Sequence, residues 1–246
     1  MKLRGELIPV RQISAVERCA MYALMDRYYE NVDSDHFSAD LSEKQWVIRL
    51  SDPATGALCG FSTQMVMRID GVRGPARVLF SGDTIIDHEH WGDAALSHVW
   101  GNLTLSLMDQ AEAAGEEMYW FLICKGYKTY RFLPVFFREF YPRHDRPTPP
   151  WAADLIGRIG QRKCPDAFEA ATGIIRADAG KDRLRAGVAD LTPQRLRDPH
   201  VAFFAQRNPA HARGDELCCI APLTRENYAP AAWRVIRAGE PAAATP

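Results

Sequence analysis

Apolar residues recur at helical spacing in two stretches of the chain. The first follows residues 14–17, whose Ser-x-x-Glu pattern is a capping box that satisfies free amides at a helix start, and should end near Asn31. The second runs from Trp100 to Ala114 and meets Gly115, a residue type common just after helix ends. We therefore expect two amphipathic helices, the first followed by a polar loop with a short helix.

Strand-like patterns fill most of the chain between and around these helices. Residues 45–50, 58–69 and 77–87 follow one another across tight turns that contain Pro and Gly, which favours an antiparallel meander. Residues 118–124 (MYWFLIC) form a continuous apolar run, suited to a strand that is covered on both faces. A short extended segment at 6–13 precedes the first helix.

The remaining part of the chain gives weaker patterns. An aromatic helical segment is expected over 128–141, and four prolines in residues 142–151 then mark a boundary. We expect short strands at 201–205 and 217–222, and a terminal helix within 226–238.

These elements predict an α/β (α+β) fold with a mixed, mostly antiparallel central sheet flanked by helices. We divide the chain into a core at 1–141, a proline-rich connection at 142–152, a C-terminal extension or second lobe at 153–240, and a disordered tail at 241–246.

Composition excludes several classes of protein. The 246 residues are 47% apolar and 25% charged, the ordinary balance of a soluble globular protein. Thirty basic residues against 31 acidic ones give a net charge of -1, so no overall positive field favours nucleic acid or an anionic membrane. No apolar run approaches the roughly 20 residues of a membrane helix, the first residues lack the apolar core of a signal peptide, and no CxxC pair occurs. We expect a cytoplasmic protein without stable membrane insertion.

The loop after the third meander strand contains a candidate anion site. Residues 89–94 read Glu-His-Trp-Gly-Asp-Ala, and Gly92 and Ala94 would let the backbone approach an anion at a helix start. With the order of elements over residues 5–141, this loop resembles the pyrophosphate loop (Gln/Arg-x-x-Gly-x-Gly/Ala) of the GCN5-related N-acetyltransferase (GNAT) superfamily. The chain departs from that pattern at Glu89 and adds a second negative charge at Asp93.

The resemblance implies an N-acyltransferase that moves an acyl group from acyl-CoA or an acyl carrier protein to an amine acceptor, such as a peptide or a natural-product intermediate. The donor would meet Lys125 and the loop residues Glu89, His90, Trp91, Gly92, Asp93 and Ala94.

Asp83 interrupts an otherwise apolar strand, where a carboxylate costs free energy unless it is hydrogen-bonded or reactive. In the resembled family an acidic residue on this strand often acts as the general base toward the acceptor amine, and burial would raise its pKa to a useful range. The alternative is a structural aspartate bonded to neighbouring amides in a bulge marked by Gly82.

Other candidates carry weaker signals. The family commonly keeps a tyrosine near the start of the helix after the buried strand, where it protonates the departing thiolate. The spacing from the strand favours Tyr130 over Tyr127, although both are ordinary packing residues. His88 or His90 is a candidate auxiliary base. No third and fourth ligand accompany these histidines at recognisable spacing, so we expect no metal site.

Alternatives remain open. The aromatic residues of 119–121 and 132–141 either pack the core or line an apolar channel for an acyl chain longer than acetyl. Glu89 and Asp93 favour a non-catalytic GNAT-like protein that binds an acyl thioester or serves as a scaffold. Residues 27–46 are faintly similar to acyl-homoserine-lactone synthases, whose acidic and arginine positions do not align convincingly here.

Overall fold

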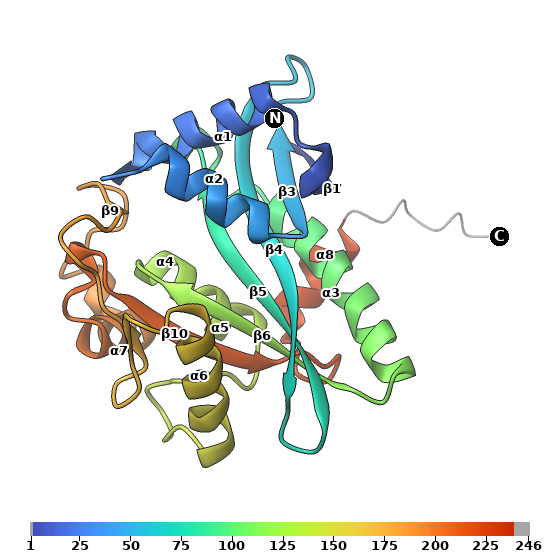
Figure 1. Ribbon diagram of the computed structural model, residues 1–246, viewed down its shortest axis with the longest axis vertical. Helices are drawn as coiled ribbons and strands as arrows, with labels where there is room; N and C mark the ends of the chain where they lie inside the picture. Colours follow the sequence, from blue (N-terminus) through green and yellow to red (C-terminus); the bar gives the residue numbers. More distant parts are fainter. Residues whose placement is uncertain (1, 239–246) are drawn as a thin grey trace.

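An eight-stranded mixed sheet forms the centre of the computed structural model, which describes residues 2–238 (Figure 1). The strand order is β1-β3-β4-β5-β6-β10-β8-β7, and every neighbouring pair is antiparallel except β5 and β6. This confirms the predicted mixed, mostly antiparallel sheet. The strands are β1 Arg4–Pro9, β3 Trp46–Ser51, β4 Leu58–Asp70, β5 Pro75–Ile86, β6 Glu117–Cys124, β7 Phe168–Glu169, β8 Ile174–Ile175 and β10 Glu216–Pro222, with β2 Tyr29–Glu30 and β9 Arg183–Leu184 as a separate pair.

Helices cover both faces of this sheet. Successive β5 residues show the division, because Val78 and Phe80 pack on the same side as α6 whereas Leu79 packs on the same side as α3 and α8. α1 and α2 cover Val47 and Phe61 near the other end of the sheet. The helices are α1 Ala15–Tyr28, α2 Ser34–Glu43, α3 Ala95–Ala113, α4 Tyr127–Tyr130, α5 Phe132–Phe136, α6 Pro150–Lys163, α7 Pro199–Arg207 and α8 Pro230–Arg237.

The signals at helix ends act as the sequence suggested. Ser14 Oγ accepts from the Glu17 amide at 3.2 Å and the Ser14 amide donates to Glu17 Oε2 at 2.9 Å, so the predicted capping box is present. Gly115 adopts a φ of +65° just after α3. Within residues 2–238, none of the helices has the length and apolarity that crossing a bilayer requires.

Two predicted elements differ from the structure. Residues 201–205 are helical, not extended, because Asp198 accepts the His200 amide at 2.9 Å and Pro199 occupies the first turn, which together start α7. The aromatic helix predicted over 128–141 ends at Phe136 instead. The chain after it is extended and bridges to Tyr228 and Ile220, where backbone pairing replaces helical hydrogen bonds.

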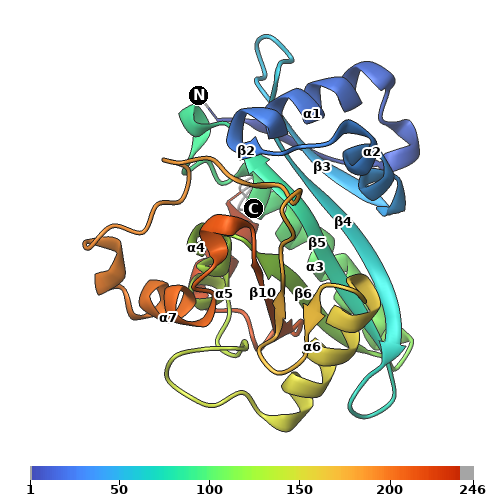
Figure 2. The same cartoon turned by 60° about the vertical axis from the view of Figure 1, so that its left-hand side comes forward.

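The chain after the proline-rich residues 142–152 joins the same central sheet. β10 lies between β6 and β8, with Leu217 opposite Cys124, and β9 pairs with β2. Figure 2 shows this C-terminal chain, in orange, beside the blue end of α1. The tail predicted at 241–246 lies outside the described residues.

Candidate active site

β5 and β6 run parallel and then diverge. Their pairing extends from Ala76 opposite Glu117 to Ser81 opposite Leu122 and stops there. Beyond that point β5 stays paired with β4 as far as Ile86, while β6 stays paired with β10. The facing edges of the two strands therefore have backbone groups without ladder partners, as an exposed sheet edge has.

A cavity of about 880 Å³ lies where the two strands diverge, a size typical of ligand and cofactor sites. Its wall includes residues of α2, the end of β5, the loop before α3, the start of α4, and the segment between β8 and β9. A narrower cavity of about 60 Å³ shares Gly82, Thr84 and Phe136 with it and extends past Trp100 and Ile236. This smaller, mainly apolar cavity therefore adjoins the main one on the side of α3 and α8.

Asp83 lies at a β-bulge on β5. On β4 only Thr63 lies opposite the two β5 residues Gly82 and Asp83. A Cβ at Gly82 would lie 2.6 Å from Thr63 Oγ1 and 2.9 Å from Lys44 Cε, so glycine is needed at this position. Bulges re-aim side chains, and here Asp83 forms part of the cavity wall.

The Asp83 carboxyl group is held in a state suited to proton transfer. Burial raises its pKa from 3.8 to about 6, and the nearby Asp40 carboxylate adds to the rise while Lys125 opposes it. The bulge at Gly82 is present, but no amide in the described chain donates to the Asp83 carboxylate. A half-buried carboxylate with this pKa can accept a proton near neutral pH.

The donor side of the cavity, which we define as residues 91–97 with Lys128, contains most of the predicted phosphate loop. Gly92 adopts a φ of +100°, a conformation that favours glycine. The backbone amides of Gly92, Ala94, Leu96 and Ser97 have no hydrogen-bond partner within residues 2–238. They lie at the positive end of a 19-residue helix and can donate to an anion.

This side contains one carboxylate that is bonded to backbone amides and one ammonium group that lines the cavity. Asp93 turns its carboxylate to the amides of Ala95, at 2.7 Å, and Leu3, at 3.0 Å, which offsets the negative charge noted in the sequence. The Lys128 ammonium lies 3.2 Å from the centroid of the Trp91 ring, and both side chains line the cavity. Burial lowers the pKa of Lys128. Lys128 therefore presents a positive charge to this side of the cavity.

The β10 side of the cavity, formed by the ends of β6 and β10 and the segment before β9, carries four paired ionic side chains. Lys125 forms a salt bridge with Asp182 and lies 3.5 Å from Glu216 Oε1. Lys181 Nζ lies 3.7 Å from Asp182 Oδ1 and 3.7 Å from Glu216 Oε2. Because two carboxylates already compensate the Lys125 ammonium, the contact predicted between Lys125 and donor phosphates does not fit this structure.

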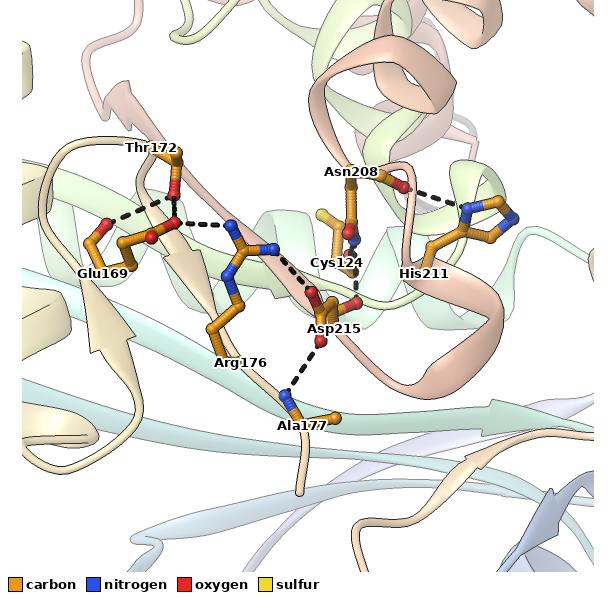
Figure 3. Close-up of polar contacts among 8 residues, drawn as sticks. All are labelled: Cys124, Glu169, Thr172, Arg176, Ala177, Asn208, His211 and Asp215. Carbon is orange, nitrogen blue, oxygen red and sulfur yellow. Dashed lines mark hydrogen bonds and ion pairs between the residues drawn. The ribbon is translucent and has the colours of Figure 1, made fainter. Parts of the chain in front are cut away.

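Asp215, which does not line the cavity, anchors the β10 side through the polar contacts in Figure 3. Its carboxylate accepts from Arg176 Nη1 at 2.7 Å and from the Ala177 amide at 2.9 Å. Asn208 Nδ2 donates to the carbonyl oxygens of Asp215, at 2.7 Å, and Cys124, at 3.5 Å. Cys124 and Asp215 immediately precede Lys125 and Glu216, so these bonds fix the end of β6 and the start of β10.

Tyr130 is not at the cavity. Its hydroxyl donates to the Pro142 carbonyl at 2.8 Å, and its ring is fully buried among core residues. The reason is helical phase: Tyr127 and Tyr130, three residues apart on α4, both face the core, whereas Lys128 and Thr129 face the cavity. The predicted contact between Tyr130 and a leaving thiolate therefore does not fit this position.

The other residues predicted around the loop lie outside the cavity wall. His88 is 59% exposed, and its Nδ1 lies 3.0 Å from Asp87 Oδ1 and 3.1 Å from the Tyr28 hydroxyl. With Glu89 and His90 it belongs to a single turn of 3-10 helix before the loop, so none of the three lines the cavity. Among residues 2–238, no three His, Cys, Asp or Glu side chains are grouped in a way that could hold a metal ion.

Tyr29 lines the cavity, although its sequence context gave no catalytic signal. β2 pairs it with Leu184 of β9, and its ring centroid lies 5.4 Å from Lys125 Nζ. Burial and the nearby Asp83 and Asp182 carboxylates raise the pKa of Tyr29, so its hydroxyl keeps its proton. Contacts between distant parts of the chain place it here, which a local pattern cannot reveal.

Comparisons with known proteins give partial structural matches only. No protein-family model matches the chain, and no curated protein matches it. The chain is similar in part to N-acetyltransferases of known structure. A probable N-acyltransferase from Enterococcus faecalis matches with a TM-score of 0.41 and 14% identity over 56% of this chain, which spans 33% of that protein.

Two further structures match over a similar share. A GNAT family N-acetyltransferase from Escherichia coli, in complex with CoA, is 13% identical with a TM-score of 0.35, covering 55% of this chain and 69% of that protein. Glucosamine-6-phosphate N-acetyltransferase from Arabidopsis thaliana is 12% identical with a TM-score of 0.35, covering 54% and 90%. We therefore base the functional proposal on the geometry of the cavity.

Proposed function

We propose that this protein is an N-acyltransferase that moves an acyl group from an acyl-CoA thioester to the amine of a small-molecule or peptide acceptor. The position of Asp83 carries the proposal. A bulge places this carboxylate, with a pKa of about 6, in the wall of a cavity that lies between two diverging strands. Acyl transfer to an amine needs such a base, because an amine must lose a proton as it attacks.

The proposed reaction uses groups that line the cavity. The amine nitrogen attacks the thioester carbonyl carbon, and Asp83 takes the proton that the nitrogen loses. Backbone amides on the open edges of β5 and β6 donate to the carbonyl oxygen as its negative charge develops. The carbon–sulfur bond then breaks, the Tyr29 hydroxyl donates a hydrogen bond to the departing thiolate, and the proton that Asp83 took passes through solvent to that thiolate.

The donor side supplies the contacts for the CoA phosphates. Four free amides at the start of α3, together with the Lys128 ammonium, offer hydrogen bonds and positive charge to a diphosphate. We place the acyl chain in the smaller apolar cavity that adjoins the main one, whose volume of about 60 Å³ favours a short chain over a long fatty chain. We therefore propose acetyl or a slightly longer acyl group. An acyl carrier protein would present one phosphate to the same amides.

The test is thiol release from acetyl-CoA in the presence of a pool of amines, with the acylated product identified by mass spectrometry. We expect turnover by the wild-type protein and almost none by Asp83→Asn. Parallel reactions with acetyl- and octanoyl-carrier protein compare the two kinds of donor. If the protein binds acyl-CoA and neither variant nor wild type releases thiol, the chain is the non-catalytic thioester-binding protein and the proposal fails.

A further inference from the structure

Carboxylates outnumber ammonium groups in the part of the cavity wall away from the donor loop. Six of them, which we call the acidic wall, come from α2, β5, β10 and the segment before β9: Asp33, Asp40, Asp83, Asp178, Asp182 and Glu216. The ammonium groups facing them are those of Lys125 and Lys181, together with Lys44, which pairs with Asp40. The acidic wall therefore keeps an excess of negative charge.

Glu216 has an unused hydrogen-bond acceptor in this wall. Its side chain is 7% exposed, and Oε2 is buried without a hydrogen-bond partner among the described residues. Lys181 Nζ lies 3.7 Å from Oε2, which is beyond hydrogen-bond distance. A buried carboxylate oxygen without a donor costs free energy, which an ammonium group of a ligand would recover.

We infer that the acceptor is an alkyl diamine or polyamine, whose second ammonium binds Glu216 Oε2 while its reacting amine faces Asp83. This inference rests on the proposed acyl transfer. A monoamine would leave the excess negative charge of the acidic wall uncompensated, whereas the additional ammonium groups of a polyamine would compensate it. Aromatic rings of Tyr29 and Phe37 line the same cavity and suit both the methylene chain and the cation.

The first experiment measures acetyl transfer to three amines that differ in charge: spermidine, 1,4-diaminobutane and n-butylamine. We expect kcat/KM to be at least about tenfold higher for the di- and triamine than for butylamine, as one charged hydrogen bond would give. Glu216→Gln should remove this preference by raising KM for spermidine about tenfold more than it raises KM for butylamine. Lys181→Gln should act in the opposite direction and lower KM for spermidine, because it removes an ammonium group that competes for the carboxylates of Asp182 and Glu216.

Glu112→Gln is the matched control, since Glu112 is an exposed carboxylate on α3, away from the cavity. It should leave the preference unchanged. Thermal unfolding of each variant identifies any that fails to fold, and Lys181→Gln keeps the test decisive if Glu216→Gln does not fold. Equal kcat/KM for butylamine and spermidine, a preference that survives Glu216→Gln, or a preference that Lys181→Gln fails to raise would overturn the inference.

Calorimetric titration of spermidine into the protein separates this inference from the proposed function. Spermidine binding that Glu216→Gln weakens, without consumption of any thioester, would support the amine site and overturn the acyltransferase proposal. Butylamine acetylation without measurable spermidine binding would support the acyltransferase proposal and overturn the amine site.

Discussion

The donor side and the β10 side of the cavity are built in different ways. The donor side uses mainly backbone amides and apolar side chains, and its residues come from two short stretches of chain that flank α3 and follow β6. The β10 side uses charged side chains from the ends of β6 and β10 and from the segment before β9. In the proposed function, strand divergence and a helix start hold the thioester donor, while side chains from distant segments select the acceptor.

The largest expected effect comes from removing the base that both sides share. Asp83→Asn keeps the shape of the side chain but cannot accept a proton, so we expect kcat to fall by about 10²–10³. Donor binding, measured by calorimetry with CoA, should stay within about twofold of wild type. Asp154→Asn, which alters an exposed carboxylate on α6, is the control and should have full activity. Undiminished kcat in Asp83→Asn would remove Asp83 from the mechanism.

The same carboxyl group predicts a pH dependence. The base works only when deprotonated, so kcat/KM should fall about tenfold per pH unit below a pKa of about 6 and level off above it. This limb should be absent from the residual activity of Asp83→Asn. A profile whose acid limb is unchanged in Asp83→Asn would assign that titration to another group.

The free energy of unfolding should depend on pH in the opposite direction from kcat/KM. The pKa of Asp83 is higher in the folded chain than in the unfolded chain, so the unfolded state binds fewer protons between the two values and stability falls as pH rises from about 4 to 6. At pH 8 the free energy of unfolding of Asp83→Asn should therefore exceed that of the wild type by about 1–3 kcal/mol, and thermal unfolding should occur at a higher temperature. At pH 4 the two proteins should differ little.

The two sides also differ in how much of them the sequence predicted. Local patterns located Gly92 and the start of α3, because a glycine-containing loop between a strand and a helix is readable from neighbouring residues. The position of Asp83 followed from one polar residue in an apolar strand. Glu216 and Asp182 gave no local signal, since their place in the cavity depends on β10 entering the sheet beside β6 and on β9 pairing with β2.

Tyr130 shows a second limit of sequence patterns. The spacing from the buried strand predicted a tyrosine at the cavity near the start of this helix, but one residue along a helix rotates a side chain by about 100°, from cavity to core. The helix begins at Tyr127, which fixes Tyr130 toward the core and leaves Tyr29, from a different segment, as the tyrosine near Asp83. Only the tertiary structure decides between them.

Replacing Tyr29 should have a smaller effect than replacing Asp83. A thiolate leaves readily because thiols have a pKa near 8.5, so a hydrogen bond from solvent can partly replace the one from the Tyr29 hydroxyl. We therefore expect Tyr29→Phe to lower kcat about tenfold. Tyr130→Phe is the matched control, since its hydroxyl bonds only to a backbone carbonyl; it should lower stability and leave kcat unchanged. A larger loss of kcat in Tyr130→Phe than in Tyr29→Phe would restore the assignment made from the sequence.

The smallest expected effect concerns the donor side alone. Gly92→Val should strain a backbone that has a φ of +100° and displace the free amides of the loop, raising KM for acetyl-CoA several-fold while kcat at saturation changes little. Gly56→Val imposes a comparable strain at a φ of +74° in the turn between β3 and β4, away from the cavity, and neither glycine has atoms within 4 Å of an added Cβ. The two variants should therefore lose similar stability in thermal unfolding but differ in KM. If both raise KM equally, or neither does, the amides before α3 do not bind the donor, and the contrast between a backbone-built donor side and a side-chain-built acceptor side does not hold.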